Sequence, residues 1–133
     1  MHDSSSERFW SRRSPILSTG GMAATSQPPA TDAAAQVLSA GGTAADAAVA
    51  AAAALQVTQA CSTGLGGDAF FLYYEASSGT VHALNGSGRS PKALSLERLR
   101  ADGFDDEIPS THPHAVTVPG AARAWQDLLD RFG

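Results

Sequence analysis

The fold is decided by the stretch GGMAATSQPPATDAAAQVLSAGGTAADAAVAAAAALQVTQACSTGLGGDAFFLYYEASSGTVHALNGSGRSP, residues 20–91. It begins with two alanine-rich segments that a glycine pair separates. A second glycine-rich loop follows, and two segments rich in aromatic and β-branched residues complete the stretch. Alanine has the highest helix propensity, whereas aromatic and β-branched residues favour strands. The order therefore predicts two helices followed by a β-hairpin.

The first helix is predicted over residues 31–40. Two consecutive prolines stand just before it, and because proline is not tolerated in a helix interior, Thr31 or Asp32 is the expected N-cap. Gly41 and Gly42 should end this helix, since one of them can adopt the left-handed conformation. The residues expected on its buried face are Ala33, Ala34, Val37 and Leu38.

The second helix is predicted over residues 44–56 and is nearly all alanine. Thr43 is its expected N-cap, and Asp46 in the first turn suits the positive end of the helix dipole. Small side chains let another backbone approach closely. The alanine block is also much shorter than the roughly 20 apolar residues that span a bilayer. We therefore expect a buried helix of a globular protein that does not insert into membranes.

The hairpin is predicted from an aromatic strand over residues 69–74 and a return strand over residues 80–84. The first is expected to be a buried strand. The serines and glycine of residues 75–79 supply the turn. Helices combined with an antiparallel hairpin give an α+β fold, in which the alanine-rich helices pack on the hairpin.

The last third of the chain has a weaker pattern. A short helix is predicted to about residue 102, a loop over 102–114 and a short strand over 115–118. A final helix is predicted over 121–132 because its apolar residues recur at helical spacing. That apolar face comprises Ala122, Trp125, Leu128, Leu129 and Phe132.

Length and charge restrict the possible classes of protein. The 133 residues suffice for one domain, which we assign to residues 21–133, after a flexible lead over residues 1–20. The net charge of -4 argues against nucleic-acid binding through a basic surface. No apolar signal-peptide core is visible near the N-terminus, which favours a cytoplasmic location.

Two motifs with possible chemistry are interpreted as structural. The glycine loop over residues 64–68 lacks the lysine of a phosphate-binding loop and runs from helix to strand, so we expect a tight connection. Cys61 has no basic neighbour in sequence and is expected to be a buried thiol. The histidines lack metal-site spacing, so no metal or other cofactor is predicted; His82 is expected at the surface or as a satisfied core residue.

The polar run NGSGRSP, residues 85–91, follows the return strand. Its residue types are those of a turn. It also contains Arg89, whose planar guanidinium can donate two parallel hydrogen bonds to a carboxylate. Arg89 is therefore the first candidate for binding an acidic small molecule.

Four motifs give the chain a resemblance to a known family: GMAATSQPPAT (21–31), GGTAADAAVAAAAAL (41–55), CSTGLGGDAFFLYY (61–74) and AVTVPGAARAWQDLLDRFG (115–133). In this order they resemble the N-terminal part of the large subunit of gamma-glutamyltransferases. The resemblance implies a partial αββα sandwich of the N-terminal-nucleophile hydrolase class. It also implies a precursor that cleaves itself and a threonine that attacks gamma-glutamyl amides such as glutathione, passing the acyl group to water or an amino acid.

The resemblance has consequences for the site residues. No threonine of this chain matches the family's nucleophile, so we expect the 133-residue chain to need the small-subunit portion and to be inactive alone. Where typical members have an Arg-Glu-x-Ala-Pro-like run, alignment on Pro91 puts Ser87 in the arginine's place and Arg89 two residues later. Residues two apart on a strand share a face, so Ser87 and Arg89 are the expected substrate-binding residues.

Two further interpretations stay open. The chain could be a catalytically silent binding or scaffold domain derived from the same fold. A nucleotide-binding module is the third interpretation, which the absence of a lysine in the glycine loop disfavours. The acyl donor and the acceptor also remain open.

Overall fold

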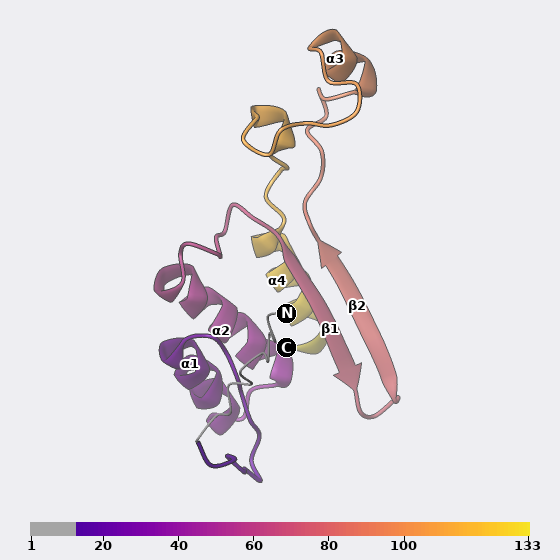
Figure 1. The fold of residues 1–133 in the computed structure, drawn as a ribbon. Helices are drawn as coiled ribbons and strands as arrows, with labels where there is room; N and C mark the ends of the chain where they lie inside the picture. The colour runs from indigo at the N-terminus through magenta and orange to yellow at the C-terminus, as the bar shows by residue number, and fades with distance from the viewer. Residues whose placement is uncertain (1–12) are drawn as a thin grey trace, which may run out of the picture.

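The structure is a computed structural model that describes residues 13–133, so the predicted lead falls largely outside the described part. The elements are α1 (Pro28–Ser39), α2 (Ala44–Thr58), β1 (Ala69–Glu75), β2 (Thr80–Gly86), α3 (Leu96–Ala101), the 3-10 helix η1 (Pro113–Ala115) and α4 (Ala121–Phe132). Helix α4 packs on one face of an antiparallel hairpin, α2 and then α1 follow on the far side of α4, and a small lobe projects from the hairpin's end (Figure 1).

Helix α1 begins three residues before the predicted start, because the two prolines form its first turn. Proline is tolerated there, since the N–H groups of a first turn have no partner within the helix. Gln27 is the N-cap, so the prediction of Thr31 or Asp32 was wrong. Both lie inside the helix, where the Thr31 hydroxyl is 2.8 Å from that of Thr25.

The end of α1 agrees with the sequence prediction. Gly41 has a φ of 91°, and its N–H donates to the Leu38 carbonyl oxygen at 3.1 Å. The N–H of Gly42 donates to the Val37 carbonyl oxygen at 3.0 Å. These two bonds form a Schellman motif, which reverses the chain into α2.

Helix α2 starts with the predicted cap and continues two residues beyond the predicted end. The Asp46 N–H donates to the Thr43 hydroxyl oxygen at 3.1 Å, and the Thr43 N–H donates to the Asp46 carboxylate at 2.8 Å. This reciprocal pair is a capping box. No helix among the described residues is long and apolar enough to cross a bilayer.

The core between α1 and α2 is built from alanine. Larger apolar side chains are only half-buried around it, which leaves the two backbones close together. Close approach of two helices requires small residues at the contact, because any larger side chain would separate the axes. The four buried residues of this cluster are Ala30, Ala34, Ala47 and Ala51.

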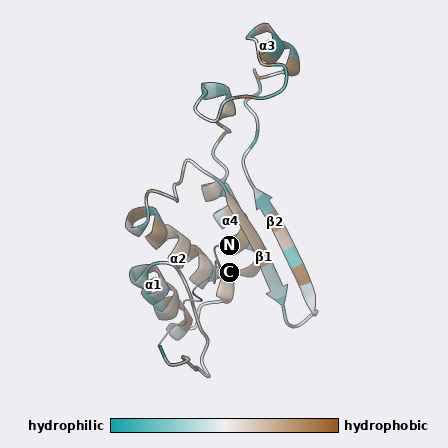
Figure 2. Ribbon diagram, viewed as in Figure 1, coloured by the Kyte–Doolittle hydropathy of each residue, from teal (hydrophilic) through white to brown (hydrophobic). Residues whose placement is uncertain are grey.

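The hairpin has the predicted strands, each slightly longer than expected, with Leu72 opposite Ala83 and Tyr74 opposite Val81. The expectation that β1 is buried was wrong for one of its faces. Phe71 and Tyr73 are half-buried, whereas Leu72 is 80% exposed and Tyr74 64% exposed. Strand β1 begins with a run of apolar residues (Figure 2), whose side chains alternate between its two faces, but within the described chain only one face is covered, by α4.

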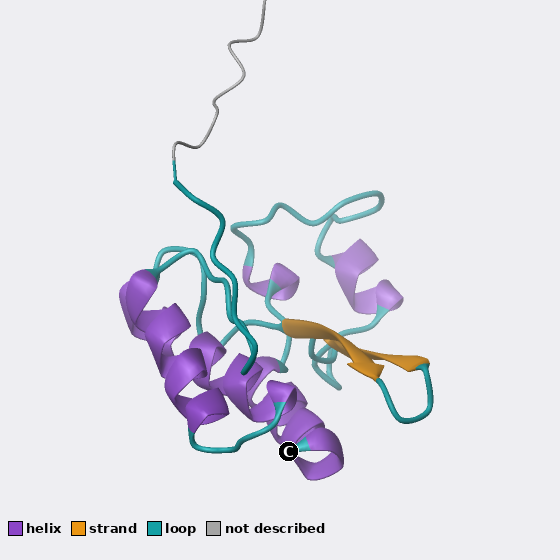
Figure 3. Ribbon diagram, turned by 90° about the horizontal axis from the view of Figure 1, so that it is seen from below, coloured by secondary structure: helices purple, strands orange, loops and turns teal. Residues whose placement is uncertain are grey.

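Helix α4 lies between α2 and the hairpin (Figure 3). Its end is anchored by Phe132, whose ring stacks on that of Tyr73 with the centroids 4.2 Å apart. The predicted helix is confirmed, but Ala122 is exposed and the buried stripe begins at Ala121. The stripe continues through Ala124 and Leu128 to Phe132. These residues are three or four positions apart, as on one face of a helix, and the face begins one residue earlier than predicted.

The lobe between residues 90 and 117 contains α3 and η1 and projects away from the helices (Figure 1). The predicted strand over 115–118 is reduced to a single antiparallel bridge between Arg89 and Val118. The Val118 N–H donates to the Arg89 carbonyl oxygen at 2.8 Å, so the lobe leaves and re-enters the body of the fold at one place.

Candidate functional site

The candidate site is a cavity of about 340 Å³ where the end of β2, the returning chain and α4 meet. Its charged lining consists of Arg89 from the segment after β2, and Arg123 and Asp127 from α4. Asn85 is the uncharged polar residue of the lining, and apolar residues and glycines form the rest of the wall. The cavity is half open to solvent and combines a volume suited to a small molecule with a few polar groups, as ligand sites commonly do.

Three glycines allow the chain segments around this cavity to cross. A Cβ atom on Gly120 would overlap backbone atoms of Gly86 and Gly88. A Cβ on Gly88 would overlap the Val118 carbonyl oxygen, and its φ of 83° also favours glycine. Only residues without a side chain fit here, so the glycines place Arg89 beside α4.

The glycine loop after α2 supports the same region. The carbonyl oxygen of Gly67 accepts hydrogen bonds from the N–H groups of Gly120 and Ala121, at 3.0 and 3.1 Å. The Gly67 N–H donates to the Gly64 carbonyl oxygen at 3.0 Å. These backbone groups are engaged within the fold, in agreement with the prediction of a tight connection, and they hold the first turn of α4.

The structure places the two predicted substrate-binding residues differently. Arg89 is exposed, lines the cavity and has no ion-pair partner among residues 13–133. Ser87 is half-buried and outside the cavity lining; its N–H donates to the Asn85 side-chain oxygen at 3.0 Å. Its carbonyl oxygen accepts from the Thr117 hydroxyl at 3.2 Å. Ser87 therefore shapes the turn that carries Arg89.

Contrary to the prediction from the sequence, Ser87 and Arg89 do not share a strand face. Strand β2 ends at Gly86, and the positive φ of Gly88 interrupts the regular alternation of side chains. The substrate-binding role of each residue remains a prediction that rests on its chemistry.

Sequence reasoning missed Arg123 and Asp127. The Arg123 Nε donates to the Asp127 Oδ1 at 2.8 Å, one turn along the exposed side of α4. Opposite charges at this spacing are a recognisable signal of a helix-surface pair. That signal alone could not place the pair in a cavity, because the other wall comes from residues 84–89.

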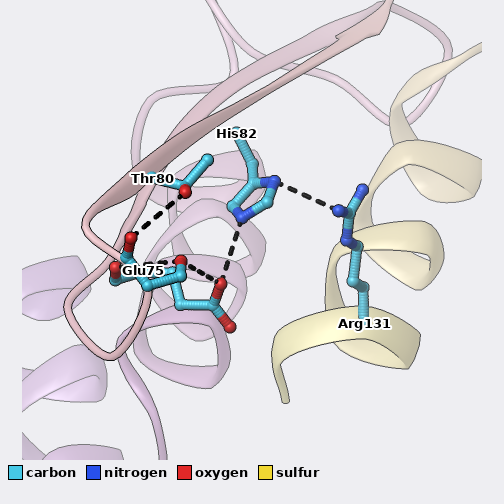
Figure 4. A network of polar contacts seen from close by, with 5 residues as sticks. Glu75, Thr80, His82 and Arg131 are labelled. Carbon is cyan, nitrogen blue, oxygen red and sulfur yellow. Dashed lines mark hydrogen bonds and ion pairs between the residues drawn. The ribbon is translucent and has the colours of Figure 1, made fainter.

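A second polar network joins the turn end of the hairpin to α4 (Figure 4). His82 Nε2 lies 3.3 Å from Glu75 Oε2, and Arg131 Nη2 lies 3.1 Å from His82 Nδ1. The Ser78 hydroxyl donates to the same Glu75 oxygen at 2.6 Å. Because an arginine only donates, His82 Nδ1 is the acceptor and Nε2 carries the proton. His82 is thus half-buried and satisfied, as predicted.

Hydrogen bonds from Ser78 and then His82 hold the pKa of Glu75 below its ordinary value of 4.5. The ionised carboxylate therefore stabilises the fold above that ordinary value, and its contribution is lost as the pH falls through the lowered pKa. We predict that Glu75→Gln makes stability less sensitive to acid. Thermal midpoints measured from about pH 6 to about pH 3 should fall more steeply for the wild type than for this variant.

The control for this prediction is Glu107→Gln, at an exposed loop residue outside the network. It should follow the wild-type profile. Equal acid sensitivity of the wild type and Glu75→Gln would show that the network does not contribute to stability.

The structure also describes two other side chains with possible chemistry, the Cys61 thiol and His114 of the lobe. Cys61 is exposed and not buried, because it lies in the turn after α2, where its Sγ is 3.6 Å from the Ser62 hydroxyl. His114 Nε2 is 2.9 Å from Asp102 Oδ2 in the lobe. Among residues 13–133, no three histidine, cysteine, aspartate or glutamate side chains are grouped as metal ligands.

Comparison with known proteins identifies similar sequences. The family model described as gamma-glutamyltranspeptidase matches residues 30–133. A glutathione hydrolase proenzyme of Bacillus subtilis is 33% identical over 118 residues, which is 85% of this chain and 20% of that protein. The glutathione hydrolase-like YwrD proenzyme of the same organism is 35% identical over 85 residues, 59% of this chain and 15% of that protein. The chain therefore spans at most about a fifth of the curated relatives it matches.

Solved structures agree with these matches. The cephalosporin acylase from Bacillus halodurans superimposes with a TM-score of 0.82 at 45% identity, covering 98% of this chain and 24% of that one. The gamma-glutamyltranspeptidase from Pseudomonas nitroreducens, in complex with L-DON, superimposes with a TM-score of 0.73 at 32% identity. That match covers 88% of this chain and 35% of the other. The described α+β architecture is thus a part of the N-terminal-nucleophile hydrolase fold of these enzymes.

Proposed function

Because the chain belongs to the gamma-glutamyltranspeptidase family, we propose that it forms the N-terminal part of the large subunit of an enzyme that cleaves gamma-glutamyl or related acyl amides, such as glutathione. The acyl group passes to water or to an amino acid. The observation that carries this proposal is the agreement of almost the whole fold with an acylase and a gamma-glutamyltranspeptidase of solved structure.

In this proposal the nucleophile is a threonine of the small-subunit portion, which lies outside residues 1–133. Its hydroxyl oxygen attacks the amide carbonyl carbon while the threonine's own α-amine takes the hydroxyl proton. Backbone N–H groups stabilise the oxyanion, and the amine product leaves with the proton. Water or an amino acid then attacks the acyl-enzyme ester and regenerates the threonine.

The proposed contribution of this chain is to bind the acyl group. Arg89 stands in a cavity of suitable size, and its guanidinium is free to donate two N–H bonds to a terminal carboxylate. Its backbone is held by the bridge to Val118 and by the glycine crossing, so the base of the side chain is fixed at the cavity before a ligand arrives. The ligand partner is therefore a small acidic amide.

The proposal predicts that the purified 133-residue chain does not hydrolyse a gamma-glutamyl anilide, whereas a graft of residues 30–133 into the Bacillus halodurans acylase yields an active protein. In the graft, Arg89→Ala should raise KM for a carboxylate-bearing acyl amide by roughly tenfold or more, since a charge-assisted pair is lost. Initial rates measured against substrate concentration test both statements.

The matched control is Arg100→Ala, at an exposed arginine of α3 outside the cavity, which should leave KM unchanged. Sustained turnover by the isolated chain would contradict the assignment of the nucleophile to another segment. A graft that folds but binds and cleaves no acyl amide would favour a silent scaffold domain.

A further inference from the structure

The lobe over residues 90–117 contains a cluster of three rings. The Phe104 ring contacts those of His112 and His114, with centroids 4.6 and 6.2 Å away, and the two histidine rings lie 4.7 Å from each other. Neither α3 nor η1 has a buried residue, so this half-buried cluster supplies much of the packing within the lobe. Segments with so few buried contacts open locally at a low cost in free energy.

The His112 side chain caps the start of η1. The His114 N–H donates to His112 Nδ1 at 3.1 Å. Because a backbone amide only donates, Nδ1 is the unprotonated acceptor, and Nε2 carries the proton of the neutral ring. Protonation of His112 turns Nδ1 into a donor, so that two N–H groups face each other. The cap of η1 is then lost.

His114, in contrast, can become charged without losing a contact. Its Nε2 lies 2.9 Å from Asp102 Oδ2, which also accepts the Arg98 Nε at 2.8 Å. Hydrogen bonds from Arg98 and then His114 hold the pKa of Asp102 below its ordinary value of 3.8. The carboxylate beside His114 therefore stays ionised over the pH range in which histidines ordinarily titrate.

A charge on His112 has no such compensation. Arg98 and Asp102, from α3 and its C-cap, are the charged side chains beside the two rings, and both are engaged with each other. The segment before α3 lines the same cavity as His114 with apolar residues only. His112 has no ion-pair partner among residues 13–133. A charged His112 thus loses its hydrogen bond and repels a charged His114.

We propose that His112 is a pH-sensitive switch, whose protonation uncaps η1, separates it from Phe104 and opens the lobe. The closed lobe is stable above the pH range of histidine titration, and that stability is lost as the pH falls through it. The opening stays local, because the lobe leaves and re-enters the body of the fold at the bridge between Arg89 and Val118. The inference does not depend on the proposed function, since no residue of the lobe lines the candidate site.

The test is a pH titration of the 133-residue chain followed by NMR, from about pH 8 to about pH 5. The ¹⁵N shifts of the imidazole nitrogens report the charge of each histidine. As His112 becomes charged, the Cα shifts of residues 112–116 should move to random-coil values, and the heteronuclear NOE of residues 96–116 should fall. The amides of α2 should keep their shifts.

Three variants separate the cap from the charge. His112→Asn keeps a side-chain oxygen that can cap η1 and does not titrate, so its lobe should stay closed at pH 5. His112→Ala has no cap, and its lobe should be open at both ends of the titration. His114→Gln keeps a donor for Asp102 and leaves His112 in place, so it should open in acid as the wild type does.

Several outcomes would overturn the inference. One is a lobe that stays closed down to pH 5, whether His112 is charged or neutral. Another is acid opening of His112→Asn, or a closed lobe in His112→Ala at pH 8. The control His82→Gln, at the turn end of the hairpin, should leave the response intact. If it abolished the opening, the response would originate in the network of His82 and not in the lobe.

Discussion

Replacing Gly120 with alanine should lower the free energy of unfolding by about 3 kcal/mol, the upper range for overpacking a tight site. The added methyl group would overlap the Gly86 carbonyl oxygen and the Gly88 nitrogen. Both are backbone atoms, so no side-chain rotation can make room. The φ of Gly120 is −106°, which alanine adopts readily. The loss of stability should therefore come from the steric overlap and not from backbone strain.

Urea denaturation of the 133-residue chain measures this effect. The control is Gly66→Ala in the loop after α2, where an added Cβ meets no atom within 4 Å. That variant should stay within about 0.5 kcal/mol of the wild type. If both variants had the same small effect, the crossing of the chain at Gly120 would be looser than the structure describes. Loss of the crossing should also weaken ligand binding, because Arg89 is positioned by it.

The second large effect is expected in the alanine core, where Ala34→Leu should cost about 2–3 kcal/mol. Ala34 is 2% exposed and faces the buried alanines of α2. Ala34 also lines a cavity of about 330 Å³ beside α2, and a leucine in any rotamer that does not point into this cavity must separate the helices or leave its preferred rotamer.

The matched control for this prediction is Ala35→Leu, the same substitution at the neighbouring exposed position of α1. It should change the free energy of unfolding by less than about 0.5 kcal/mol. Urea denaturation compares the two. Equal stability of Ala34→Leu and Ala35→Leu would contradict the tight packing of α1 on α2.

Local signals made most of the helical part predictable. The Thr43 cap, a left-handed glycine in the pair after α1 and the final helix were each predicted from a few neighbouring residues, and the structure confirms them. The start of α1 was misjudged because prolines were treated as breakers, although a first helical turn accommodates them. The sidedness of β1 could not be predicted, since AFFLYY is apolar on both faces and only tertiary contacts distinguish them.

The candidate site was predictable only in part. Arg89 was identified from its chemistry and from its position after a strand. Its surroundings depend on a long-range crossing, in which α4 returns against the end of β2 through three glycines. A local sequence pattern cannot predict which charged pair of a later helix lies in the same cavity as Arg89. Arg123 and Asp127 therefore required the three-dimensional arrangement.

The bridge between Arg89 and Val118 has a consequence for how this protein can vary. The lobe over residues 90–117 departs and returns at neighbouring points, so its length does not determine the geometry of the body. Doubling the length of a flexible loop whose ends stay together costs only about 0.6 kcal/mol of loop-closure entropy. The lobe is thus a natural place for insertion or exchange of sequence, and a guest segment there would be displayed beside the cavity without altering its wall.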